Sequence, residues 1–155
     1  MSFNQAAVES LFAEILSQVQ RLGVFDTVTQ HEPKSAPGTG LSASVWMDAI
    51  IPQPRASGVA AISGTVVFNV RIYGSMLTQP YDDIDPRVMT AVCTLLNQFS
   101  GHFTLDGTVR EVDLLGIYGR SLSAQAGYIP IDNKWFRVMT VTVPVTINDM
   151  FTEVP

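Results

Sequence analysis

The sequence feature that most constrains this chain is a long alternating stretch near its end, residues 134–149. Apolar side chains recur there at every second position, with threonine and asparagine between them. This period of two is typical of a β-strand with one buried face and one polar face. At ~3.3 Å per residue the stretch would reach roughly 50 Å, whereas an ordinary strand has about 5–6 residues. We therefore expect it to bend or to run beyond its own domain.

Pro144 lies inside this stretch and lacks the N–H group that a strand ladder requires. We expect it at a bulge or on an edge strand. A long strand with an edge or a break in it is suited to pairing with another chain. The pattern thus indicates a protein that works by assembling.

The composition favours one domain that contacts other protein. A length of 155 residues suits a single domain, so we expect residues 1–155 to fold as one. Apolar residues make up 46% of the chain and charged residues only 15%. The apolar share is enough for a core, and the low charge indicates that part of the exterior meets other protein.

The net charge, the single cysteine and the lack of long apolar runs argue against several classes of protein and of binding site. The net charge is −5 and the nine Lys and Arg are scattered, whereas a nucleic-acid binder gathers them on one face. Cys93 is the single cysteine, which excludes an internal disulfide and a multi-cysteine zinc site. No apolar run approaches the ~20 residues of a membrane span, and the N-terminus is unlike a secretory signal. We expect no membrane partner and a protein that folds where it is made.

Two stretches carry apolar residues at the spacing of amphipathic helices. Ser2 and Gln5, before the first, have the spacing of a capping box. Asp85-Pro86, at the second, predicts an N-cap followed by a first-turn proline. The two stretches are residues 8–22 and 88–99, and a glycine follows each.

Shorter strands are predicted by alternation, and loops by Gly, Pro and Ser. The two strands that flank the Pro-rich loop read as a large hairpin. We expect an α+β fold, with a mostly antiparallel sheet on which both helices pack. The strands are 24–30, 41–51, 61–73, 103–105 and 109–115, with a turn at 106–107. The loops are 31–40, 52–58 and 116–127, and we expect partners to order them.

Two patterns could bind a ligand, and both have a plainer explanation. Residues 38–43 match a degenerate dinucleotide fingerprint, but a proline loop precedes them and a strand is predicted after them. Asp82, Asp83 and Asp85 could hold a hard cation, but EF-hand spacing is absent and acids before a helix cap its amides. We predict no metal and no cofactor.

No catalytic grouping emerges from the remaining reactive residues. His31 and His102 are the only histidines, and no nucleophile elbow is present, although a Ser–His–Asp site can converge in space. Cys93 lies beside the stripe of the second helix and is predicted to be a small core residue. Arg71 and Arg137 lie within strands, where we favour interface or solvent roles over catalysis. We expect no enzyme.

The order of these elements and the segment 127–141 (GYIPIDNKWFRVMTV) resemble the tail terminator proteins of long-tailed bacteriophages, also called minor tail proteins. The likeness is one of general pattern over nearly the whole chain. The family has no short diagnostic motif and no catalytic residues to carry over.

The resemblance implies a hexameric ring of identical chains in the virion, at the neck end of the tail, assembled in the cytoplasm of the host bacterium. Such a ring caps the tail tube, ends its polymerisation and joins it to the head–tail connector, while genomic DNA passes through without specific binding. Alternatives are another neck or tube component, such as a head-completion or tail-tube protein, or a small hydrolase. The predicted partner-interface residues are Arg55, Arg71, Arg120, Lys134, Arg137 and Pro144.

Overall fold

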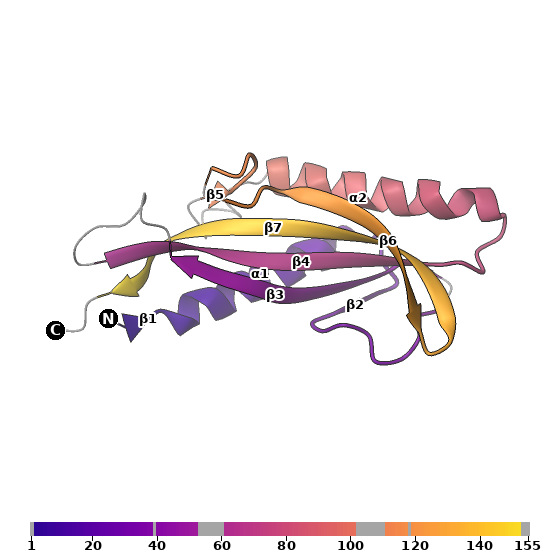
Figure 1. The fold of residues 1–155 in the computed structure, drawn as a ribbon, viewed down its shortest axis with the longest axis horizontal. Helices are drawn as coiled ribbons and strands as arrows, with labels where there is room; N and C mark the ends of the chain where they lie inside the picture. Colours follow the sequence, from indigo (N-terminus) through magenta and orange to yellow (C-terminus); the bar gives the residue numbers. More distant parts are fainter. Residues whose placement is uncertain (1, 39, 53–60, 102–110, 118, 153–155) are drawn as a thin grey trace.

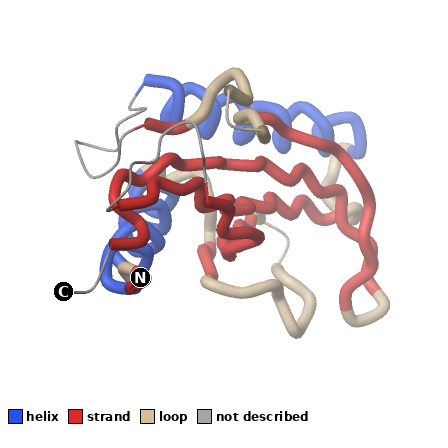
Figure 2. The backbone as a smooth tube through the Cα atoms, turned by 60° about the vertical axis from the view of Figure 1, so that its left-hand side comes forward, coloured by secondary structure: helices blue, strands red, loops and turns tan. Residues whose placement is uncertain are grey.

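Two helices lie against one face of a curled, mostly antiparallel sheet, which confirms the predicted α+β class (Figures 1 and 2). The described strands form one seven-stranded sheet. The structure is a computed structural model that describes residues 2–38, 40–52, 61–101, 111–117 and 119–152.

The two predicted helices are present, with small changes at their starts. Helix α1 spans Gln5–Arg21 and α2 spans Ile84–Gly101, directly after a short 3-10 turn, η2, at Tyr81–Asp83. The cap of α1 is Asn4 rather than the predicted Ser2, because the Asn4 Oδ1 accepts the Ala7 N–H at 3.1 Å. Ser2 instead belongs to a short strand, β1 (Ser2–Phe3), that pairs with the end of the last strand.

The sheet is built around the predicted hairpin and the predicted long strand. The antiparallel β3–β4 pair is the hairpin, and β2 adds to β3 in parallel, the one parallel pair among the described strands. The remaining strands are β2 (Thr27–Thr29), β3 (Ser42–Pro52), β4 (Ala61–Ser75), β5 (Glu111–Val112), β6 (Ser123–Ile131) and β7 (Lys134–Thr152).

The long strand β7 is central, so the expectation of an edge at Pro144 is wrong. β4 pairs along one side of β7, and β6, β5 and β1 pair along the other. Pro144 is opposite Val67 of β4, and its carbonyl accepts the Asp113 N–H at 2.9 Å. Its missing N–H therefore faces the gap between β5 and β6, where the ladder requires no donor. β7 bends where Asp149 has a φ of 55°.

The predicted loop 116–127 is too long, because β6 begins at Ser123. Its run of small residues has low strand propensity, but pairing with β7 holds it extended. A two-residue turn at Asp132 and Asn133, with φ of 52° and 63°, joins β6 to β7. The following predictions lie outside the described residues: the strand 103–105, the turn 106–107, most of the loop 52–58, and the residues His102 and Arg55.

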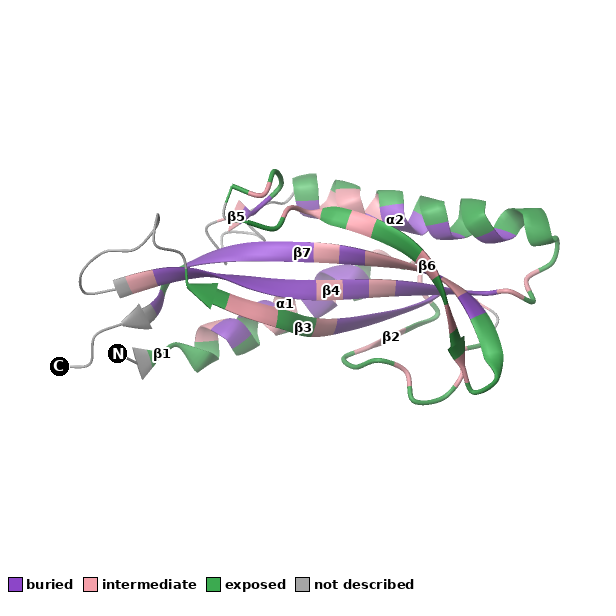
Figure 3. Ribbon diagram, in the orientation of Figure 1, coloured by how far each residue is buried: buried purple, intermediate pink, exposed green. Residues whose placement is uncertain are grey.

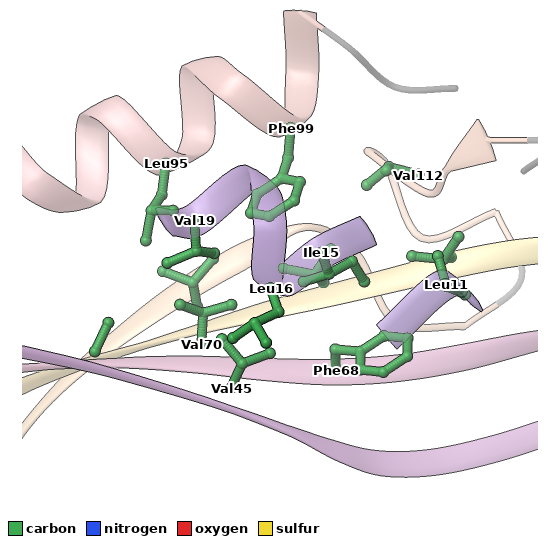
Figure 4. Close-up of a cluster of buried hydrophobic side chains, with 14 of the residues drawn as sticks. Leu11, Ile15, Leu16, Val19, Val45, Phe68, Val70, Leu95, Phe99 and Val112 are labelled. Atoms are coloured by element: carbon green, nitrogen blue, oxygen red, sulfur yellow. The ribbon is translucent and has the colours of Figure 1, made fainter. Parts of the chain in front are cut away.

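The core fills the space between the helices and the inner face of the sheet (Figure 4). Val141, Val143 and Val145 of β7 are all 0% exposed, which confirms the predicted buried face. Two predictions on α2 are wrong, because Met89 is 62% exposed and Cys93 is also exposed. The inner face of α2 is filled by a narrower stripe, Val88, Val92, Leu95 and Phe99.

Candidate assembly surface

Both outer edges of the sheet leave backbone groups unpaired within the described part of the chain. β2 pairs only with Ser42–Ser44 of β3, and no described strand lies on the far side of β6. Val45 is fully buried, so the accessible part of β3 starts at Trp46. Exposed positions recur along both segments (Figure 3). We name them the β3 edge (residues 46–52) and the β6 edge (residues 123–131).

The hydrogen-bond alternation defines which backbone groups point outward. The Met76 N–H donates to the Trp135 carbonyl at 3.3 Å. The backbone N–H and C=O groups of odd-numbered β7 residues therefore point toward β4, and those of even-numbered residues point toward β6. The residue pairs between neighbouring strands then give the direction of the backbone groups on β3 and β6 as well. The residues whose backbone groups point outward are Met47, Ile50 and Pro52 on the β3 edge and Ala124, Ala126, Tyr128 and Pro130 on the β6 edge, and the two prolines lack the N–H.

Neither edge carries an unpaired charge. The β6 edge has no charged residue, and the β3 edge has only Asp48. The Asp48 carboxylate pairs with the Arg120 guanidinium, which comes from the connection between β5 and β6. β4 and β7 separate these two segments in the strand order, so the Arg120–Asp48 pair joins parts of the sheet that are not neighbours. Free charges are one of the devices that stop exposed edge strands from pairing with other chains, and these two edges lack it, although the β3 edge has an irregularity between Met47 and Ala49 and each edge ends near a proline.

A shallow apolar groove runs beside the β3 edge, and we name it the α1 groove. Its volume is about 330 Å³, and it lies between α1 and the edge residues Trp46 and Met47. Met47 is 46% exposed there. The other lining residues are Val8, Glu9, Phe12, Gln30 and Phe68.

On the face of the sheet away from the helices, Arg71 is held by three different contacts. Its Nε donates to the Thr140 hydroxyl at 2.9 Å, and its NH1 lies 3.6 Å from the Glu32 carboxylate. Its guanidinium carbon lies 5.1 Å from the centre of the Trp46 ring. These contacts fix the loop that contains Glu32 over the sheet, and they leave the Arg71 side chain 23% exposed.

Tyr73 is fully buried next to this cluster, edge-on to Phe136 at 6.5 Å between ring centres. Burial raises the pKa of its hydroxyl, and the nearby groups of Arg71 and Ser44 oppose part of that increase. No described group meets the hydroxyl with the geometry of a hydrogen bond. The site therefore contains a neutral phenol that is costly to ionise.

On the opposite face, Arg137 joins three elements. Its Nε donates to Asp85 of α2 at 2.9 Å, and its NH1 donates to the Gly127 carbonyl at 3.3 Å. Its guanidinium carbon lies 4.4 Å from the centre of the Tyr128 ring. Arg137 thereby fastens β6 and α2 to β7, with 18% of its side chain exposed.

The five predicted interface residues that the structure describes do not form one patch. Arg71 and Arg137 lie on opposite faces of the sheet. Lys134 begins β7 at the hairpin tip, Pro144 is internal, and Arg120 supports the β3 edge. The small residues of β6 gave no strand pattern, so its edge was not predicted, although the Asp132-Asn133 pair before the long strand is typical of a hairpin turn.

The sequence patterns that could have indicated a dinucleotide, a metal ion or a catalytic histidine do not form such sites among the described residues. The last two residues of the fingerprint pattern, Ser42 and Ala43, belong to the strand β3 and not to a helix, unlike those of a dinucleotide-binding motif. Among the described residues, no three His, Cys, Asp or Glu side chains gather as a metal site would require. The His31 Nδ1 lies 2.8 Å from the Glu32 carbonyl.

Comparison with models of known protein families finds no match, and neither does comparison with curated proteins. Neither helix that the structure describes is long and apolar enough to cross a membrane.

Proposed function

We propose that this chain is a structural protein of a bacteriophage tail, which assembles as a ring on the end of the tail tube, stops tube growth and joins the tail to the head–tail connector. The observation that carries this proposal is the pair of accessible edges at opposite ends of one sheet, neither with an unpaired charge. Such edges suit a protein whose partners are protein chains.

The placement of the edges favours a closed assembly. An edge at each end of the sheet gives a head-to-tail contact between two different surfaces, and such a contact forms a ring when its rotation closes. A ring ends growth, whereas an unclosed rotation produces a filament. The predicted hexamer is one such ring.

The charge distribution is compatible with DNA passing without specific binding. The chain carries a net charge of −5, and each of Arg71, Arg120 and Arg137 has an acidic partner within the fold. Tight DNA binding would require these cations to be free for phosphates.

Deletion of the gene in its source genome, with electron microscopy of the particles, tests the proposal. We expect overlong tails or tails that fail to join filled heads, and expression of the intact chain should restore normal particles. Tails of normal length with leaking heads would identify a head-completion protein. Loss of all tubes would identify a tube subunit.

The hydrolase alternative has its own test. If the chain were an enzyme, His31→Ala, His102→Ala or Cys93→Ala would abolish function while the protein stayed folded. We expect all three variants to complement the deletion, because Cys93 is exposed and the one hydrogen bond described for the His31 ring is to the backbone carbonyl of the adjacent Glu32.

A further inference from the structure

We infer that copies of this chain associate by pairing the β6 edge of one copy with the β3 edge of the next, as an antiparallel extension of one sheet. The inference deepens the proposed function, because it names the partner surface that would close the ring. It starts from the two edges defined above and from the directions of their strands.

The strand directions make the two edges complementary. β3, β4, β7 and β6 are successive neighbours, and every pair is antiparallel, so β6 runs opposite to β3. A rotation that relates two copies of a ring keeps the sense in which β3 runs along the ring axis, whatever the tilt of the strands. Its edge then meets β6 in antiparallel orientation, which is the more stable pairing.

The backbone groups on the two edges also match. The outward N–H and C=O groups of Tyr128 and Ala126 would face those of Met47 and Ile50. Pro130, the next outward position on β6, lacks its N–H and ends the run of donors. Each edge thus offers a short ladder of alternating donors and acceptors.

The side chains beside these ladders fit as well. Tyr128 is 55% exposed and lies on the helix-bearing face of β6, above Arg137. Met47 lies on the same face of β3 and lines the α1 groove. In a continuous sheet, Tyr128 of one copy would therefore approach the apolar α1 groove of the next. A tyrosine in such a groove is a typical interface anchor.

The offset between the edges is compatible with a closed ring. Across the sheet of one copy, Gly127 is level with Ser42, so Tyr128 is level with Leu41. If Tyr128 lies opposite Met47 of the next copy, that copy is displaced along the strands by about six residues, or roughly 20 Å at ~3.3 Å per residue. Four strands at ~4.8 Å give a lateral step of roughly 19 Å. Together these steps tilt the strands by roughly 45°, at the upper end of the range of about 35–45° in closed barrels.

A proline substitution tests the pairing without disturbing the ladder inside each copy. Ala126→Pro removes an N–H that points away from β7, and proline is tolerated on an edge strand in this orientation. We expect folding, measured by circular dichroism and thermal unfolding, to stay close to the wild type. We expect association, measured by light scattering across protein concentrations, to weaken about tenfold or more. Ala126→Val keeps the N–H and should associate like the wild type.

Disulfide trapping identifies the contacting edges directly. In a Cys93→Ser background, Tyr128→Cys combined with Met47→Cys should give a ladder of covalent oligomers under mild oxidant, since opposed strand residues lie within disulfide distance. The matched control combines Met47→Cys with the native Cys93, which is exposed on α2, and should give no ladder. Both are compared in cells that make the chain alone and in cells that make tails.

The inference is overturned if no ladder forms in either kind of cell, if a different protein is trapped, or if Ala126→Pro assembles normally. In those cases the deletion phenotype can still support the proposed function. Conversely, edge-to-edge ladders with normal tails in the deletion would refute the proposed function and leave the pairing intact.

Discussion

Arg137 donates from its Nε to the Asp85 carboxylate at 2.9 Å and so ties the longest strand to the first turn of α2. We selected Arg137 from the sequence as an interface residue, and that role stays a prediction. The contacts in the structure give it a role within the fold. A charge reversal there would disturb the subunit itself, so assembly defects of such a variant need a folding control.

Arg137→Gln should lower the free energy of unfolding by about 1 kcal/mol, because it removes the ion pair of the mostly buried Arg137 with the exposed Asp85 and the contact with the Tyr128 ring. Urea unfolding followed by circular dichroism measures the change. Arg87→Gln is the matched control. Arg87 is exposed on α2, the helix that contains the partner Asp85, and it has no described ion pair. It should change stability by less than about 0.5 kcal/mol. Equal effects of both substitutions would contradict the role given to Arg137.

Tyr73 should make stability depend on pH in the alkaline range. Its pKa is raised above 10.0 in the folded protein by burial, whereas the unfolded chain has the ordinary value. The stabilisation is therefore fully present below about pH 10 and is lost as the pH rises through the folded pKa. The free energy of unfolding should fall more steeply above pH 10 for the wild type than for Tyr73→Phe. Parallel pH profiles would show that the Tyr73 hydroxyl is not the cause.

Asp113 organises the connection between β5 and β6. The side chain is 2% exposed, and its Oδ1 accepts the N–H groups of Gly116 and Ile117, each at 3.0 Å. Asp113→Ala should cost about 2 kcal/mol, because both donors lose a charged acceptor. Thermal unfolding measures the loss, and Asp48→Ala on the exposed β3 edge is the comparison. A loss no larger than that of Asp48→Ala would contradict this role.

The helices and the buried face of β7 could be predicted because their periodicity is local. Val141, Val143 and Val145 alternate in the sequence as they do in the sheet. β6 could not be predicted in the same way, since its small residues take their strand conformation from β7. The centrality of β7 was hidden for the same reason, and an unrecognised neighbour made Pro144 look like an edge residue.

The candidate surface depends on contacts that local patterns do not contain. Arg120 and Asp48 are 72 positions apart in the sequence, and only the fold brings them together. The sequence placed Arg120 among the candidates but did not predict its partner. The edge character of β3 likewise depends on how few of its residues β2 covers.

Arg120→Gln should weaken self-association by leaving an unpaired Asp48 carboxylate on the β3 edge, where a lone charge opposes strand pairing. Light scattering at several protein concentrations measures the effect. Adding Asp48→Asn removes that charge and should restore association toward the wild-type level. If the double variant associates no better than Arg120→Gln alone, Arg120 acts through some other contact.

The position of this chain on isolated tails tests the central claim most directly. Tails assembled with an affinity-tagged chain can be labelled with gold and imaged by electron microscopy. We predict one cluster of label at a single end of each tail, with tail lengths unchanged from the wild type. Label along the whole tube, or label on heads alone, would contradict the claim that copies of this chain close on the tail end.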